Sequence, residues 1–113
     1  MNINSWLETF KSNWKKGNVD QVLELFASDV DYYETPYRKL KNEELRQVWE
    51  GVKNQEDIEL DLELYSSDED KHTVKWHLSY REDGERTDLE GIYLIKLNSE
   101  GNCTEFWQYC QQE

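Results

Sequence analysis

Few side chains in this sequence have the spacing that metal binding or covalent catalysis needs. His72 and His77 lie an odd number of positions apart in a strand-like segment, so they should face opposite sides of a sheet and cannot share a metal ion. The acidic run 68–70 lacks the spaced ligands and central glycine of a calcium loop. Neither Cys103 nor Cys110 has a nearby histidine and base. We therefore expect no metal and no cofactor.

Proton transfer by a carboxylate remains as the simplest chemistry. Glu34 lies at the end of a segment in which residues alternate, and it shares a predicted strand face with Val30 and Tyr32. A carboxylate among aromatic side chains in a cleft is a candidate general base. The alternative is a carboxylate at the rim of the core, hydrogen-bonded to a Tyr or Trp, with no chemical role.

Aromatic residues are the other candidates for a binding site. The chain has five Trp, seven Tyr and three Phe, and each ring buries more area than an aliphatic side chain. Trp14, Trp49 and Trp76 fall on the apolar faces of predicted helices and a strand, where they either line a pocket or fill the core. Gln108 shares a predicted strand face with Phe106 and offers a polar group at the pocket floor.

The first half of the chain alternates between helical and strand-like periodicity. Capping signals and the spacing of apolar residues define each element. The first predicted helix has Ser5 and Glu8 as its capping pair and ends at Gly17. A second helix follows from Asn18 through Phe26, then a strand from Asp29 to Pro36, and then a third helix from its cap Asn42 to Val52.

The second half reads as four successive strands, over residues 58–64, 74–81, 87–97 and 103–109. Asp83-Gly84 is a hairpin signal between two of them. With no repeat and no linker, residues 1–113 should form a single domain. The helices need a surface and the sheet needs a cover, so we predict a cone-shaped α+β fold of order α-α-β-α-β-β-β-β. Its three N-terminal helices pack in a strongly curved, mixed or antiparallel sheet.

The charge balance limits the partners. A net charge of -12, from 25 acidic and 13 basic residues, disfavours nucleic acid and anionic membrane surfaces. We find no signal peptide and no apolar stretch long enough to span a membrane. We therefore expect a cytoplasmic protein whose Cys103 and Cys110 stay reduced.

Several stretches, in this order, resemble the SnoaL-like branch of the nuclear transport factor two-like superfamily. They are GNVD at 17–20, LFASDV at 25–30, Pro36 before an amphipathic helix, and GIYLIKLNSEG at 91–101. The resemblance extends from Trp6 to Tyr109. It implies a curved sheet around a deep cavity, and activities that range from polyketide cyclases, ketosteroid isomerase and dehydratases to non-catalytic binding or assembly domains.

The resemblance to ketosteroid isomerase also implies residue roles. That enzyme uses an Asp base, with a Tyr and a protonated Asp as donors to the oxyanion. The base position falls on Glu34 or on Thr35, depending on the direction of counting, and strand parity favours Glu34. The Tyr position is Phe10, which has no donor, and the protonated Asp position is Tyr93, which has one. The predicted catalytic residues are Glu34 and Tyr93, and the predicted ligand contacts are Phe10, Trp14, Tyr32, Trp49, Trp76, Phe106 and Gln108.

Two functions fit these observations. The first is a pocket for a small, largely apolar molecule, cyclic ones included, with acid–base chemistry of the isomerase, cyclase or dehydratase type. The alternative is a non-catalytic homodimeric assembly or binding domain whose own aromatic residues fill the cavity. A cavity of about 300 Å³ or more would favour the first function, and a cone without voids the second.

The opposite face of the sheet predicts a homodimer. If Tyr93 points toward the helices, its neighbours point away and form an apolar patch that a monomer rarely leaves bare. The patch consists of Ile92, Leu94, Trp107 and Tyr109. The alternative is that the stems of Lys75, Arg81 and Lys96 cover it and the chain stays monomeric.

Overall fold

A computed structural model describes residues 2–112 of the chain. Its elements are α1 (Ile3–Lys16), α2 (Val19–Leu23), β1 (Phe26–Thr35), β2 (Arg38–Leu40), α3 (Asn42–Glu50), the 3-10 helix η1 (Gly51–Asn54), β3 (Glu56–Asp68), β4 (Lys71–Glu82), β5 (Glu85–Leu97) and β6 (Cys103–Gln112). This order confirms the predicted α+β class and adds β2 and η1 to it.

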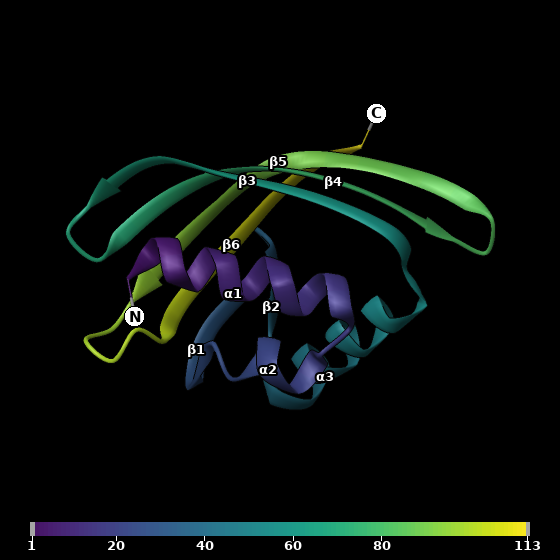
Figure 1. Ribbon diagram of the computed structural model, residues 1–113. Helices are drawn as coiled ribbons and strands as arrows, with labels where there is room; N and C mark the ends of the chain where they lie inside the picture. Colours follow the sequence, from purple (N-terminus) through teal and green to yellow (C-terminus); the bar gives the residue numbers. More distant parts are fainter. Residues whose placement is uncertain (1, 113) are drawn as a thin grey trace.

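All strands belong to one six-stranded sheet, in the order β2-β1-β6-β5-β4-β3. Strands β3 to β6 pair antiparallel in succession, whereas β1 joins β6 in parallel. Figure 1 shows the sheet arching over the three helices, which lie against its concave side. The predicted cone with a mixed sheet is confirmed.

Helix α1 turns one apolar face to the sheet. Its cap is Asn2, whose side chain accepts a hydrogen bond from the Ser5 backbone N–H at 2.9 Å, so the predicted start at Ser5 is wrong. Gly17 ends the helix in a left-handed conformation, as predicted, with φ of 70°. The buried face consists of Ile3, Trp6, Leu7, Phe10 and Trp14.

The structure corrects the end of α2, the start of β1 and the N-cap of α3. Helix α2 ends at Leu23 because Phe26 already lies in β1, beside Cys103 of β6. Tertiary pairing here overrides the helical spacing of Phe26. Strand β1 begins at Phe26 rather than at Asp29, and it ends at Thr35, so Pro36 stops it as predicted; β2 then folds back antiparallel on β1. Helix α3 has Lys41 at its N-cap, not Asn42.

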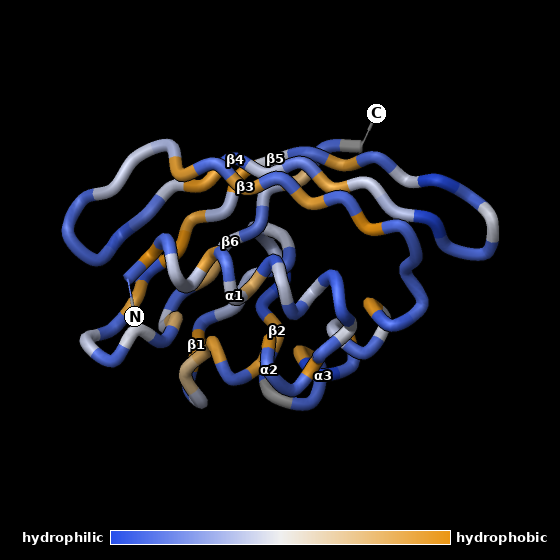
Figure 2. The backbone as a smooth tube through the Cα atoms, viewed as in Figure 1, coloured by the Kyte–Doolittle hydropathy of each residue, from blue (hydrophilic) through white to orange (hydrophobic). Residues whose placement is uncertain are grey.

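The β4–β5 hairpin sets the register of the concave face. Asp83 and Gly84 both have positive φ, 54° and 82°, as a two-residue type I′ turn requires. The resulting register places Trp76 opposite Gly91. Along β5 and β6, Tyr93 is then opposite Gln108. Figure 2 shows hydrophobic and hydrophilic positions alternating along these strands, which is the pattern of a sheet with one covered face.

Within residues 2–112, no helix has the length and apolar character needed to cross a bilayer.

Candidate functional site

A cavity of about 170 Å³ is lined by residues of α1, α3 and the concave face of the sheet. Its volume equals that of about six waters at ~30 Å³ each, and it is smaller than the ~300–1,000 Å³ of drug-sized sites. The cone is therefore neither free of voids nor as hollow as a large-ligand pocket. The lining residues are Trp14, Tyr32, Glu34, Val48, Trp49, Val52, Gln55, Trp76, Leu78, Tyr80, Leu89, Tyr93 and Gln108.

Seven of the nine predicted site residues meet at this cavity. They come from α1, α3 and strands β1, β4, β5 and β6, and they are Trp14, Tyr32, Glu34, Trp49, Trp76, Tyr93 and Gln108. Their chemical roles stay predictions. The other two, Phe10 and Phe106, are fully buried and lie outside the lining.

The two phenylalanines support the lining residues from behind. Phe10 packs edge-to-face on Trp49, with ring centres 5.5 Å apart. Phe106 stacks on Tyr32 at 4.8 Å and contacts Tyr93 at the same distance. Thr35, the alternative base position, is exposed, and its hydroxyl accepts a hydrogen bond from the Tyr37 backbone N–H.

Sequence reasoning missed several lining residues. Tyr80 shares the inward face of β4 with Trp76, so strand parity was sufficient to find it. Gln55 follows η1, where no periodicity applies. Its side-chain oxygen accepts the indole N–H of Trp14 at 2.9 Å, which fixes one wall of the cavity.

Glu34 lies at the junction between cavity and solvent. Its Oε1 is 4.0 Å from a guanidinium nitrogen of Arg38, whose side chain is 61% exposed. Its Oε2 is buried and has no hydrogen-bond partner among the described residues. One carboxylate oxygen thus lies at the rim near Arg38, and the other is buried in the lining of the cavity.

The unpaired buried polar atoms of the described side chains all belong to this lining. They are Glu34 Oε2, Trp49 Nε1 and Trp76 Nε1. Leaving such a group unpaired costs roughly 1–3 kcal/mol. These three atoms are the polar groups of the lining that the described residues leave without a hydrogen-bond partner.

Burial keeps the two inner phenols protonated. It raises the pKa of both Tyr32 and Tyr93 above the usual range. For Tyr32, the indole N–H of Trp49 partly offsets this rise in pKa, although the two groups do not reach hydrogen-bond geometry, and the charge of Glu34 adds to it. Both hydroxyls thus remain hydrogen-bond donors at neutral pH.

The position of the Trp76 indole depends on Gly91. A Cβ at this position would collide with the backbone carbonyl of Tyr109 and lie 2.9 Å from Cζ2 of Trp76. The absence of a side chain lets the indole lie across β5. Trp76 then stacks on Tyr93, with ring centres 5.2 Å apart.

Other reactive groups lie elsewhere. Among residues 2–112, no cluster of three His, Cys, Asp or Glu is arranged to hold a metal ion. Cys103 and Cys110 are free thiols. Burial raises the pKa of the Cys103 thiol to about 12, so it is a poor nucleophile.

A sequence comparison identifies the family. The SnoaL-like domain matches residues 7–106 of the chain. The protein belongs to the SnoaL-like family. No curated protein matches it significantly.

Solved structures share the fold of this SnoaL-like chain at low sequence identity. The Delta 5-3-ketosteroid isomerase of a Mycobacterium species has a TM-score of 0.80 at 12% identity, with 98% of each chain covered. SalBIII is an epoxide hydrolase/cyclase-like enzyme with a role in pyran ring formation in the polyether salinomycin. It has a TM-score of 0.80 at 12% identity, and the match covers 96% of this chain and 89% of the SalBIII chain.

A third solved structure of this fold contains a bound small molecule. It is a ketosteroid isomerase-like protein from Catenulispora acidiphila in complex with trimethylamine. Its TM-score is 0.74 at 15% identity, and the match covers 92% of this chain and 83% of that one. At these identities the likeness establishes the fold alone.

Alkaline unfolding tests the burial of the inner phenols. Because burial raises the pKa of Tyr32 and Tyr93, the folded state binds more protons than the unfolded state above pH ~10. The free energy of unfolding should therefore fall as pH rises past this point, by about 1.4 kcal/mol per pH unit for each phenol. In urea titrations at stepped pH, Tyr32→Phe should remove about half of this slope. Tyr37→Phe, which alters an exposed side chain, should leave the slope unchanged. Equal slopes in all three proteins would contradict the burial.

Proposed function

We propose that the cavity binds a small, largely apolar molecule, cyclic ones included, and that Glu34 transfers a proton to and from it. The observation that carries this proposal is that the cavity lining holds a carboxylate, Glu34, together with the indoles of Trp49 and Trp76, and that one polar atom of each has no hydrogen-bond partner among the described residues. A bound molecule supplies partners that the described part of the chain does not.

The arrangement around Glu34 suits a general base. Arg38 approaches one carboxylate oxygen at the rim and leaves the other directed inward. Tyr32 and Tyr93 remain protonated donors, and the amide of Gln108 adds a further polar group to the lining. Isomerase, cyclase and dehydratase reactions can share one step, the removal of a proton by a base. The proton then goes to another carbon in an isomerase, to an oxygen of the product in a cyclase, and to the departing hydroxyl group in a dehydratase.

The structural neighbours support this proposal as precedents for the fold. They are an isomerase, an enzyme of ring formation and a protein in complex with a small amine. The cavity volume of about 170 Å³ argues for a compact ligand, smaller than the drug-sized molecules that most pockets hold.

Exposed apolar residues on the convex face of the sheet indicate a second property, self-association. Ile92 and Leu94 are exposed and pair across strands with Tyr109 and Trp107 respectively. Trp107 stacks on Tyr33 of β1 at 3.7 Å, which extends the patch along the sheet. We therefore propose a two-fold homodimer through this face, as a property of the pocket protein or of a non-catalytic assembly domain.

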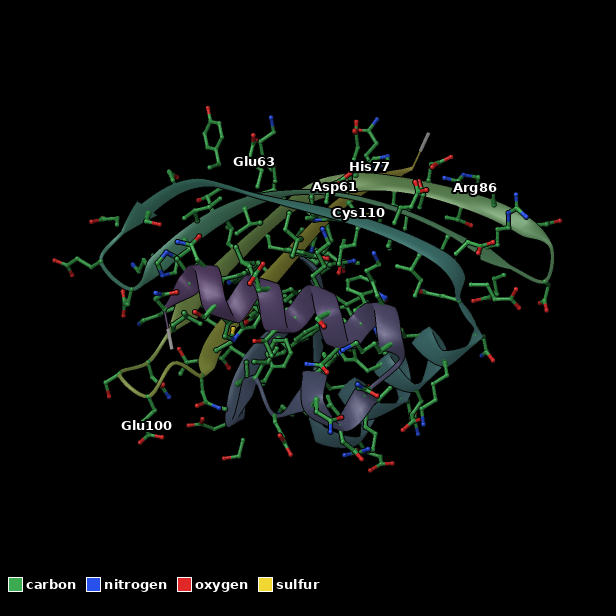
Figure 3. All side chains as sticks on the ribbon, in the orientation of Figure 1. Asp61, Glu63, His77, Arg86, Glu100 and Cys110 are labelled. Atoms are coloured by element: carbon green, nitrogen blue, oxygen red, sulfur yellow. The ribbon has the colours of Figure 1, made fainter. Side chains whose placement is uncertain are left out.

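The charged residues of the convex face lie mainly beside the patch. Lys75 and Arg81 point to the edge strand β3, at 3.8 Å from Glu63 and 3.9 Å from Asp57. Asp61 and Glu63 lie on this convex side, away from the helices (Figure 3). The side chains of Lys75 and Arg81, which could otherwise cover the apolar patch, are thus engaged in ion pairs with β3.

Two expectations accompany the proposal. We place the protein in the cytoplasm, where Cys103 and Cys110 remain reduced thiols. We also expect no nucleic-acid partner, because of the net charge of -12.

Removal of the carboxylate tests the proposed chemistry. A thermal-shift screen of small cyclic ketones and lactones identifies binders, since a ligand specific for the folded state raises the melting temperature. Exchange of a binder's acidic hydrogens with deuterated water, followed by NMR, then reports proton transfer without knowledge of the natural substrate. Glu34→Gln should slow this exchange ~100-fold or more and change affinity only a few fold. Glu85→Gln, in the exposed β4–β5 hairpin, serves as the control. An unaltered rate in Glu34→Gln would end the catalytic proposal.

Sedimentation tests the proposed dimer. Wild type should be dimeric at tens of micromolar, and Leu94→Glu should be monomeric because it buries an unpaired charge at the centre of the patch. Tyr37→Glu, in the exposed β1–β2 turn outside the patch residues, should remain dimeric. A monomeric wild type contradicts the proposed interface, and a dimer that resists Leu94→Glu shows that another face is used.

A further inference from the structure

We propose that a hollow on the convex face of the sheet binds a small organic anion, namely a carboxylate on a flat apolar body. Lys71 of β4 and Lys96 of β5 hold the carboxylate, and the body packs on Leu94 and Trp107. This site lies on the opposite side of the sheet from the cavity under the helices, so the inference goes beyond the proposed function.

The hollow is the right size for a small molecule. Its volume is about 460 Å³, and it lies at the end of the sheet where β3 turns into β4 (Figure 1). Small-molecule sites have volumes of ~300–1,000 Å³, a range that the concave cavity of about 170 Å³ does not reach. The hollow is therefore the roomier of these two candidate sites.

Strand register brings the lining side chains of the hollow to one face. Lys71 and Thr73 lie two positions apart on β4, and Leu94 and Lys96 lie two positions apart on β5. Lys71 is opposite Lys96, and Thr73 is opposite Leu94. Residues in these positions share a face of the sheet. Leu94 is exposed, whereas its neighbour Tyr93 is buried against the helices, so the shared face is the convex one.

The two lysines are like charges placed directly opposite each other, which destabilises a pair of antiparallel strands. A carboxylate flanks each of them, because Asp68 is opposite Lys71 and Glu105 is opposite Lys96. Among residues 2–112, however, neither ammonium group lies within 4.0 Å of a carboxylate oxygen. Lys96 is also half-buried. The described chain thus leaves two adjacent positive charges without a counter-ion.

The Glu105 carboxylate is engaged by an indole instead. Trp107 donates its indole N–H to this carboxylate at 2.8 Å. The same indole stacks on Tyr33 of β1, with ring centres 3.7 Å apart, which fixes its position. Trp107 and the exposed Leu94 line the hollow beside the lysines. We call these two side chains the apolar wall of the hollow.

Charge and shape together discriminate between ligand classes. A neutral apolar molecule leaves both lysines unpaired, and a small inorganic anion leaves the apolar wall bare. A dianion meets Asp68 and Glu105 in the same row of the sheet, in a chain with a net charge of -12. A monoanionic carboxylate on a flat body suits both the lysines and the wall. The hydroxyl groups of Ser66 and Thr73, which also line the hollow, are further donors for its oxygens.

Indole NMR signals show where such an anion binds. The probes are sodium benzoate, benzamide, which has the same shape without the charge, and sodium acetate, which has the charge without the ring, all at one ionic strength. In wild-type protein labelled with ¹⁵N, benzoate should bind with a dissociation constant on the order of 1 mM, as expected for a ligand of this size. It should move the indole signal that is missing from Trp107→Phe. Benzamide and acetate should each bind at least about fivefold more weakly.

Lysine variants test which charges hold the carboxylate. Lys71→Gln and Lys96→Gln should each weaken benzoate binding about fivefold, and the double variant should weaken it about 20-fold or more. Lys15→Gln is the matched control, because it removes the same charge from an exposed lysine of α1, on the other side of the sheet. The control variant should bind benzoate as wild type does.

The proposed dimer patch shares Leu94 and Trp107 with the hollow, so the benzoate titration is done on two proteins. One is wild type, and the other is Ile92→Gln. Ile92 belongs to the patch but does not line the hollow, and a polar amide there should weaken the dimer without changing the charge. A shift of the Trp107 signal in either protein supports the site. Its absence from both overturns the site.

The remaining outcomes keep this inference separate from the proposed function. Equal affinity for benzoate and acetate would mean an adventitious ion only and would overturn the proposal, as would benzoate affinity that neither lysine variant lowers. Movement of the other indole signals alone would place benzoate in the concave cavity, which overturns the anion site and supports the pocket. Failure of the anion site leaves the test of Glu34 unaffected, since that test uses different ligands and a residue on the other side of the sheet.

Discussion

The packing of Phe10 against the concave face of the sheet is the contact on which the rest of the structure depends. Its ring lies 6.0 Å from Tyr93 of β5 and 6.2 Å from Phe106 of β6, and it also contacts Trp14 and Trp49. This one side chain thus joins α1 and α3 to the sheet. Only 36% of the chain is hydrophobic, so a few large rings carry the core. Rigid rings also keep the cavity open, because they cannot bend into the space as aliphatic chains do.

The same rigidity explains the unpaired polar atoms. The Trp76 indole is stacked on Tyr93, and Trp49 packs edge-to-face on Phe10 and Trp14, so neither ring turns freely toward an internal acceptor. Each unpaired group costs roughly 1–3 kcal/mol, in a domain whose total stability is typically ~5–15 kcal/mol. Local arrangements that oppose stability in this way are expected where a protein binds or reacts. Glu34, with one oxygen 4.0 Å from the Arg38 guanidinium and the other unpaired, belongs to the same lining.

The sequence allowed prediction of what periodicity controls. Strict alternation placed Trp76, Tyr93 and Gln108 on the covered face, and parity chose Glu34 over Thr35. Periodicity did not predict β2, which is too short to show a pattern. It also did not predict the end of α2, which is set by the pairing of Phe26 with β6. The depth of Phe10 and Phe106 depends on how α1 crosses the sheet. The unpaired indoles depend on ring orientation, which residue spacing does not encode.

The most direct test of the cavity as a polar binding site is a crystal structure at a resolution that shows ordered water. We predict electron density inside the cavity within hydrogen-bond distance of Glu34 Oε2, Trp49 Nε1 and Trp76 Nε1, from waters or a bound molecule. A cavity closed by side chains, with both indoles donating to groups of the protein itself, would contradict the central claim that this cavity is a polar binding site.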